Sequence, residues 1–325
     1  MTSFCPLGID VAKRSFDAVL LLPEGRTRHH QFANHPAGFA ALQSWLRRHA
    51  TGAVHAGLEA TGRYGEALAL FLHQAGARVS VINPARTHAF AKSELARNKT
   101  DKLDAALIAR FVATQAPPAW TPAPAEQRQL QTVVRRLEAL QAMRQAEQNR
   151  LDLESADSPI RDSLVQHVAH LDEQLRQLRR DLAAHVRAHP TLADQSRLLQ
   201  SIPGIGETTA LKLLAELPAL SQRRSARQVA AYAGLNPAQR QSGSSVHGRG
   251  HLSKIGNARL RRALYLPAVV AMRCNPLLRV FAERLHQRGK APMIIVGAVM
   301  RKLLHQACGV LKHAQSFNPN HVHAS

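Results

Sequence analysis

The sequence predicts an α/β domain at the N-terminus, followed by a region that is almost entirely α-helical. Up to Gln115, short apolar runs rich in β-branched residues alternate with segments of helical periodicity. Pro117, Pro118, Pro122 and Pro124 then mark a linker, beyond which apolar residues recur at helical spacing. The 325 residues suffice for about two domains, each with its own hydrophobic core.

The N-terminal part is expected to begin with a meander of three strands, in which Pro23–Glu24–Gly25 forms a turn. Helices and strands alternate after the meander, and the last strand stops at Asn83–Pro84. The expected strands are residues 5–12, 17–22, about 28–32, 53–59 and 78–82, and the expected helices are 36–49, one ending near Ala75, and others up to Gln115. This order indicates a mixed sheet with helical cover, as in an RNase H-like domain.

Two long helices with apolar seams are expected after the linker. The second has the regular spacing of a heptad repeat, with the members Leu164, Val168, Leu171, Leu175, Leu178 and Leu182. The first, from about Glu126 to Leu153, has a rougher seam of Leu130, Val133, Leu137 and Leu140. An antiparallel hairpin turning near Ser158–Pro159, or a dimerising coiled coil, would bury these seams. A helical pair that packs on its own domain without a partner is the alternative.

The rest of the chain, residues 197–313, is expected to be mainly helical, with a Gly/Ser-rich loop at about 236–256. Pro190 ends the second long helix. We therefore predict three segments: a sheet domain over residues 1–120, a coiled-coil helical hairpin over 121–192 and a helical domain over 193–325.

The chain is strongly basic, with a formal net charge of +21. From Arg240 to Lys312 there are fourteen Arg or Lys residues and a single acid, Glu283. A one-sign field of this size attracts a polyanion, and nucleic acid is the default candidate, although basic charge can also serve solubility alone. The basic residues expected to contact nucleic acid are Arg249, Lys254, Arg259, Arg261, Arg262, Arg301 and Lys302. Aromatic residues make up 4% of the chain, so stacking on bases is not the expected binding mode.

Cysteine usage and hydropathy favour a cytoplasmic protein. Cys5, Cys274 and Cys308 are odd in number and lack zinc-site spacing, which fits a reducing compartment. The N-terminus lacks the profile of a signal peptide, and the longest apolar stretches, Leu264–Met272 and Ala291–Met300, are shorter than a membrane span.

Four acids stand where a strand ends or a helix begins: Asp10, Glu59, Asp101 and Asp104. Thr100 is a good N-cap, and the i, i+3 spacing of Asp101 and Asp104 places both on one face of a first helical turn. Each acid alone has an ordinary explanation, such as the helix dipole or a turn cap. Four converging carboxylates would repel unless a cation neutralised them, and Mg²⁺ prefers such oxygen ligands. Mg²⁺ acting on a phosphodiester is therefore the predicted chemistry.

Two glycine-containing segments of the C-terminal region are candidates for phosphate contact. Residues 241–250 (QSGSSVHGRG) combine serines with exposed backbone N–H groups, so one serine could act as a nucleophile on phosphorus; a flexible loop is the alternative. Residues 201–210 (SIPGIGETTA) resemble a helix-hairpin-helix turn, in which the backbone at Gly204 and Gly206 would bind DNA phosphate. A plain turn between helices is the alternative reading there.

Several motifs resemble those of DEDD-type insertion-sequence transposases. The N-terminal ones are GIDVAK, LEATGRYG, INPARTHAFAKS and RNKTDKLDA, and the C-terminal ones are SIPGIGETTA, YAGLNPAQRQSGSSVHGRGHLSKIGNARLRRALY and GAVMRKLLHQACGVLK. They follow in order over nearly the whole chain, whereas the middle helices match only in character.

This resemblance implies a RuvC-like nuclease domain, a coiled-coil insertion and a helical transposase domain that bears a catalytic serine. It implies recombination guided by a structured noncoding RNA, called bridge RNA, that pairs with donor and target DNA, and homodimers that pair into tetramers. In the family the four acids bind Mg²⁺ and the serine links covalently to DNA. The acids correspond to Asp10, Glu59, Asp101 and Asp104, and the serine to Ser242, with Ser244 and Ser245 close by in sequence.

Two other functions are compatible with the same residues. One is a metal-dependent junction nuclease that hydrolyses DNA with water. The other is a nucleic-acid-binding protein without chemistry, such as a silent copy. All three predict binding that weakens steeply with salt.

Overall fold

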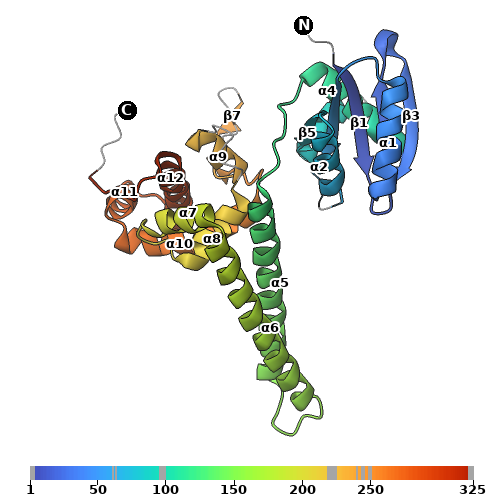
Figure 1. The fold of residues 1–325 in the computed structure, drawn as a ribbon. Coiled ribbons are helices and arrows are strands. Elements are labelled where there is room, and N and C mark those ends of the chain that lie inside the picture. Colours follow the sequence, from blue (N-terminus) through green and yellow to red (C-terminus); the bar gives the residue numbers. More distant parts are fainter. Residues whose placement is uncertain are drawn as a thin grey trace. The chain divides into compact units, whose positions relative to one another are not determined.

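The computed structural model describes residues 4–60, 62, 64–94, 100–217, 225–238 and 251–320, together with the backbone of 241–242 and 246–247. The chain divides into two compact units, Met1–Pro122 and Ala123–Ser325. Figure 1 shows a sheet with helices in the first unit and a long helical hairpin with shorter helices in the second.

The first unit contains a mixed five-stranded sheet with the order β3-β2-β1-β4-β5. Neighbouring strands of the meander are antiparallel, whereas β1 pairs with β4, and β4 with β5, in parallel. The strands are β1 (Cys5–Val11), β2 (Ser15–Leu21), β3 (Thr27–Ala33), β4 (Val54–Glu59) and β5 (Arg78–Ile82). Strand order and direction agree with the mixed sheet that the sequence predicts.

Helices cover both faces of this sheet. Alternate residues along a strand point to opposite faces. One set, which includes Leu7, Ile9 and Leu58, packs against α1 (Pro36–His49) and α2 (Glu66–Gln74) in one core. The opposite face carries glycines and small residues and packs against α4 (Asp101–Gln115), which follows α3 (Pro84–Ser93).

The beginning of the predicted linker runs along the outer edge of β5. The Trp120 N–H donates to the Val79 carbonyl (2.6 Å), and Ser80 Oγ donates to the carbonyls of Pro117 (3.1 Å) and Pro118 (2.9 Å). The linker thereby covers a strand edge that would otherwise expose unpaired backbone groups.

The second unit begins with an antiparallel hairpin of α5 (Ala125–Leu153) and α6 (Arg161–Ala188), shown in Figure 1. Buried residues follow both predicted seams: Leu130, Leu137 and Leu140 on α5, and Val168, Leu171, Leu175 and Leu182 on α6. On α5 the residue buried between Leu130 and Leu137 is Val134, whereas the predicted Val133 is partly buried. The seams are thus buried within one chain, and a coiled coil with a partner stays a prediction.

Shorter helices complete the second unit: α7 (Pro190–Gln200), α8 (Glu207–Glu216), α9 (Ala226–Tyr232), α10 (Ala258–Cys274), α11 (Pro276–Gln287) and α12 (Pro292–His313). By length and hydropathy α12 could cross a membrane, as could α10 and α11 together as a pair bent by 92°. The apolar run near Ala291–Met300 therefore belongs to a longer helix than the sequence suggests. More than half of its apolar window, 56%, is buried inside the unit, as is typical of a core helix.

Candidate catalytic and nucleic-acid-binding sites

Asp10 and Glu59 lie side by side at one end of the sheet. In the parallel pairing of β1 with β4, Ile9 is opposite Leu58, so Asp10 and Glu59 occupy the next position on each strand. They share the face of Gly8 and Gly57, because residues two apart on a strand point the same way. This is the face that α4 covers.

The helix α4 brings Asp101 and Asp104 to the same end. A Cβ added to Gly8 would lie 2.0 Å from the Ala105 carbonyl oxygen, so the missing side chain lets α4 approach the strand. The Thr100 hydroxyl caps the helix by accepting from the Leu103 N–H (3.2 Å). The first turn of α4, which carries both acids, is therefore fixed at the strand ends.

The charges at this end of the sheet act on one another. Burial, together with the negative charges of Asp104, Asp101 and Glu59, raises the pKa of Asp10 to about 6. A carboxyl group that resists ionisation in this way gains from a nearby cation. We call Asp10, Glu59, Asp101 and Asp104 the acid cluster.

The acid cluster fits a hard divalent cation by its donor chemistry, since all four groups are carboxylates. In the part of the chain that the structure describes, no three His, Cys, Asp or Glu side chains are gathered closely enough to hold a metal ion. The acids thus share one end of the sheet without forming a closed ligand cage, and the metal assignment rests on their donor type and on the repulsion that three of them exert on Asp10.

Thr87 is a further polar residue at this site that sequence reasoning missed. Its hydroxyl donates to Glu59 Oε1 and lies 2.9 Å from the Pro84 carbonyl oxygen. Thr87 is only 1% exposed, so the contact orients the Glu59 carboxylate from within the core. The Asn83–Pro84 helix start was visible in the sequence, but the contact across 28 residues was not.

Asp17 forms a second polar cluster on the same face of the sheet, and it was also missed. It is paired directly with Asp10 across β1 and β2 and is 6% exposed. Its two oxygens contact His29 Nε2 (2.6 Å) and Gln31 Nε2 (3.0 Å) on β3. An acid inside the apolar run FDAVLL was the signal that could have found it.

The predicted serine loop contains two short antiparallel ribbons. β6 (Pro237–Ala238) pairs with β9 (His251–Leu252), and β7 (Gln241–Ser242) pairs with β8 (Val246–His247). The backbone of Ser242 is opposite Val246. The Ser242 side chain and the whole of Ser244, Ser245 and Arg249 lie outside the described residues.

We call residues 232–257, which contain the predicted serine loop, the serine segment. The chain passes close to itself where this segment begins and ends. A Cβ on Gly256, whose φ is +141°, would lie 2.2 Å from the Tyr232 carbonyl oxygen. The Asn257 N–H donates to that oxygen (2.6 Å), and Asn257 Oδ1 caps α10 by accepting from the Arg259 N–H (2.9 Å). The two ends of residues 232–257 are therefore held together.

A buried ion pair ties this crossing to the hairpin. Glu216, at the end of α8, accepts from Arg135 Nε (2.8 Å) and Nη2 (3.2 Å) on α5, and from Asn257 Nδ2 (2.9 Å). Glu216 is 5% exposed, so its charge depends on these partners. We call Arg135, Glu216, Asn257 and Tyr232 the clasp; sequence reasoning did not find it, because its members come from four helices or their ends.

The two glycines of the predicted phosphate-binding turn differ in their surroundings. A Cβ on Gly204 would lie 2.7 Å from the Ala271 Cβ on α10, and its φ is +102°, so packing and conformation alone require glycine there. Gly206 is the exposed N-cap residue of α8, and a Cβ there would meet open space. Gly206 is thus the better placed of the two to approach a phosphate.

Some of the predicted basic residues are held by contacts within the protein, and others are exposed, partly buried or placed over an aromatic ring. Arg259 pairs with Glu138 (3.0 Å), and Arg261 donates to the carbonyls of Ala233 (3.0 Å) and Lys254 (3.2 Å), so both have structural contacts. Lys254 and Arg262 are exposed, Arg301 is half-buried, and Lys302 lies over the Phe281 ring.

The acid cluster belongs to the first unit, and the serine segment and the clasp belong to the second. Each unit thus carries one part of the predicted chemistry.

Two family models match the chain. One described as "Transposase", the DEDD type of IS110, covers residues 7–153, and one described as "Transposase IS116/IS110/IS902 family" covers residues 196–283. The first match includes all four residues of the acid cluster, and the second includes Ser242.

Two of the similar proteins match nearly the whole length of the chain. The pilin gene-inverting proteins of Moraxella bovis and Moraxella lacunata are each 34% identical over 315 residues, which cover 96% of this chain and 97% of theirs. The "Insertion element IS110 uncharacterized 43.6 kDa protein" of Streptomyces coelicolor is 37% identical over 128 residues, 39% of this chain and 30% of that protein.

Proposed function

Because this chain belongs to the IS110 family of DEDD transposases, we propose that it is an RNA-guided DNA recombinase with a composite active site. In this proposal Asp10, Glu59, Asp101 and Asp104 hold Mg²⁺ at the scissile phosphate, and Ser242 is the nucleophile. The single observation that carries it is the convergence of the four acids at one end of a mixed sheet, where three of them raise the pKa of Asp10.

The serine reaction conserves the phosphodiester bond. Ser242 Oγ loses its proton and bonds to phosphorus, while the bond from phosphorus to one strand end breaks and that oxygen takes up a proton as a hydroxyl. A hydroxyl of the exchanged strand then attacks the phosphoserine, which releases the serine and seals the new junction. Bound Mg²⁺ would polarise the phosphate and stabilise its developing charge.

The names of the Moraxella relatives support strand exchange over simple cleavage. Inversion of a gene requires that the cut strands be rejoined in a new order, and a covalent intermediate keeps the bond energy for that step. The partners in this proposal are donor and target DNA, a structured guide RNA, and further copies of the chain that form a dimer and then a tetramer. The place of action is the bacterial cytoplasm, at the nucleoid.

A DNA duplex nicked close to the cleavage position, so that a short product diffuses away, tests the serine assignment. We expect the intact protein to form an adduct with DNA that survives denaturing electrophoresis, and Ser242→Ala to form none. Ser244→Ala and Ser245→Ala are matched controls that should keep the adduct. An adduct that persists in Ser242→Ala would show that the serine assignment is wrong.

The variant Asp10→Asn distinguishes a role of the acid cluster in cleavage from a role in DNA binding. The variant should bind DNA but cleave it at least about a hundredfold more slowly, since an essential charge is lost. Undiminished cleavage by Asp10→Asn would remove the acid cluster from the active site.

A water-using nuclease is the second candidate, and one observation favours it: the whole acid cluster lies in the first unit, without the serine. Cleavage without any adduct in the intact protein would support this candidate. A protein that binds but never cleaves would support the third, a silent nucleic-acid-binding copy.

Guidance by RNA is tested by sequencing the RNA that copurifies with the protein and comparing it with the DNA flanking its gene. The absence of any specific RNA would contradict RNA guidance.

A further inference from the structure

The hairpin has a polar interruption in its apolar seam. Leu137 and Leu140 are buried on α5, but the next seam position, one turn further on, is Arg144. Its guanidinium donates from Nε to Asp172 Oδ1 (2.8 Å) and from Nη2 to Oδ2 (3.3 Å) on α6. A cavity of about 520 Å³ lies between the helices at this point. We call it the hairpin notch.

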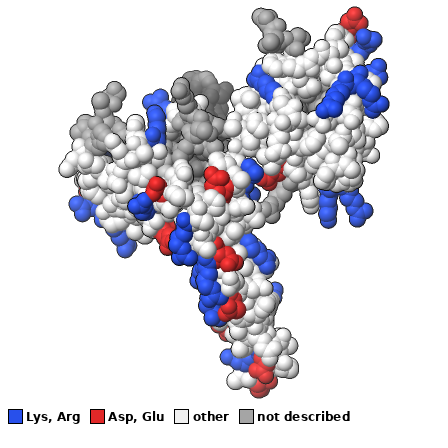
Figure 2. Space-filling view, viewed as in Figure 1, with Lys and Arg blue, Asp and Glu red and all other residues white. Residues whose placement is uncertain are grey.

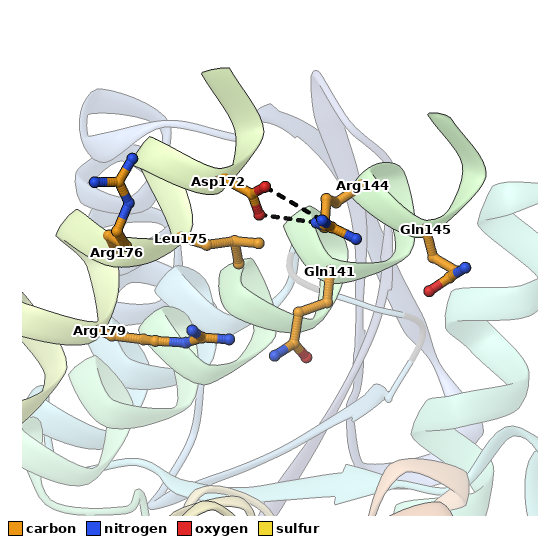
Figure 3. Close-up of a pocket in the computed structure, with 7 residues that line it drawn as sticks. All are labelled: Gln141, Arg144, Gln145, Asp172, Leu175, Arg176 and Arg179. Carbon is orange, nitrogen blue, oxygen red and sulfur yellow. Dashed lines mark hydrogen bonds and ion pairs between the residues drawn. The ribbon is translucent and has the colours of Figure 1, made fainter. Parts of the chain in front are cut away.

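Figure 3 shows how side chains from both helices line the notch. Leu175 lies in its centre, and Arg179 extends from α6 toward the amide group of Gln141 on α5. The ion pair of Arg144 with Asp172 closes one side. The notch therefore has Leu175 at its centre, and around it lie guanidinium and amide groups and the Asp172 carboxylate.

Donors and positive charge exceed acceptors at the notch. Within the described residues, Arg179 and Gln141 form no side-chain hydrogen bond or ion pair, while Arg176 pairs with the exposed Glu173 (2.8 Å). The hydrogen bond from Arg144 holds the pKa of Asp172 below its usual value, and the charges of Arg176 and Arg179 act in the same direction. Asp172 is thus committed to Arg144, which leaves Arg179 without an anion of its own.

Positive side chains continue beyond the notch. Figure 2 shows Lys and Arg side chains along the hairpin, with Asp and Glu side chains among them. On α6 the notch arginines are followed by Arg180, which pairs with Glu173 (3.3 Å), then by Asp181 and by Arg187. Arg176 to Arg187 spans about 16 Å of helix, at a rise of about 1.5 Å per residue. A row of this length suits an extended polyanion with repeated charges better than a single small anion.

We propose that the hairpin notch binds a phosphate of a nucleic-acid backbone, with Arg179, Arg176 and the Gln141 amide as donors. The planar fork of arginine matches the oxygens of a phosphodiester, and the amide supplies a neutral donor beside it. This proposal depends on the proposed function only in taking nucleic acid as the partner. The contact would lie on the hairpin, outside the basic segment from Arg240 to Lys312.

The salt dependence of binding tests this site in the full-length protein. Arg179→Gln removes one charge without leaving an ion-pair partner behind. The matched control is Arg150→Gln, which removes one exposed charge from the same hairpin, at an ion pair with Glu147. A DNA duplex and an RNA duplex of the same arbitrary sequence are titrated separately by fluorescence anisotropy, between about 50 and 200 mM salt.

We expect Arg179→Gln to weaken binding several-fold at the lower salt and to reduce the slope of log K against log salt by about 0.9, the value for one phosphate contact in duplex DNA. Arg179→Lys keeps the charge and should keep most of the slope. Arg150→Gln should leave it unchanged. The arm in which the slope falls identifies the nucleic acid that occupies the notch.

An unchanged slope in both arms, with circular dichroism showing a folded variant, would overturn the proposal. An equal loss in Arg150→Gln would overturn it too, because general charge and not the notch would then explain the effect. The serine adduct is measured separately, so failure of the proposed chemistry would be distinguishable from failure of this binding site.

Discussion

The acid cluster and the serine segment are held in place by different means. The acid cluster lies on three elements, β1, β4 and α4, that pack against one another through the close contact of Gly8 with Ala105. The serine segment contains ribbons of two residues per strand, and the clasp holds its two ends together. A set of acids can thus be held in place by the packing of the fold, whereas the segment that contains Ser242 is tied at its base by a few contacts between distant residues.

The largest effect is expected where the fold fixes the acids. Gly8→Val should destabilise the protein by about 3 kcal/mol or more, because its side chain would overlap the backbone of α4. Cleavage should fall with it. Gly309→Ala in α12 is the control: a Cβ there meets open space, so we expect unchanged or slightly higher stability. Urea denaturation of both variants measures this, and equal stabilities would contradict the close packing of α4.

The clasp should be nearly as costly to break. Arg135→Gln leaves the buried Glu216 carboxylate without its ion pair and should cost about 2–3 kcal/mol. The adduct yield should fall more than DNA affinity does, if the clasp positions the serine segment. Glu138→Gln, at a more exposed ion pair, should cost under about 1 kcal/mol. If Arg135→Gln loses no more stability than this control, the clasp does not hold the segment.

Substitution of Asp10 is expected to have a smaller effect, and to raise the stability of the protein where the preceding variants lower it. Folding raises its pKa from 3.8 to about 6, so its stabilising contribution is complete below about pH 4 and is lost as the pH rises through 6. At pH 8 without divalent ions, Asp10→Asn should therefore raise the melting temperature by a few degrees, about 1 kcal/mol after solvent screening.

The gain from Asp10→Asn should vanish near pH 4. In the proposed site, Mg²⁺ should raise the melting temperature of the intact protein and not of Asp10→Asn. A lower melting temperature for Asp10→Asn at pH 8 would contradict the charge repulsion in the acid cluster.

The smallest effects are expected from the loss of one helix cap in each unit. Thr100 caps α4, and Ser225 caps α9 in a capping box with Gln228. Either residue changed to Ala should cost about 1 kcal/mol. Thr100→Ala should also slow cleavage, because the cap fixes the turn that carries Asp101 and Asp104, and thermal melts with a cleavage assay test both. Loss of activity without loss of stability would point to direct contact of Thr100 with DNA.

The sequence was sufficient for the strands of the sheet and for placing the four acids at strand ends and in a first helical turn, because these depend on local patterns; their metal binding stays a prediction. Strand ends, the Thr100 cap and i, i+3 spacing specify where the acids lie, and parallel pairing brings Asp10 beside Glu59. Glu216 could not be found in this way. Its role comes from its contact with Arg135, 81 residues away, which leaves no periodic signal.

The proposed serine chemistry can be tested by identifying the residue that becomes linked to DNA. The adduct formed by the intact protein is digested with nuclease and protease, and the modified peptide is located by mass spectrometry. We predict a single phosphoserine linkage at Ser242, formed in the presence of Mg²⁺ and absent from Asp10→Asn. A linkage at another residue, or cleaved DNA with no linked peptide at all, would contradict it.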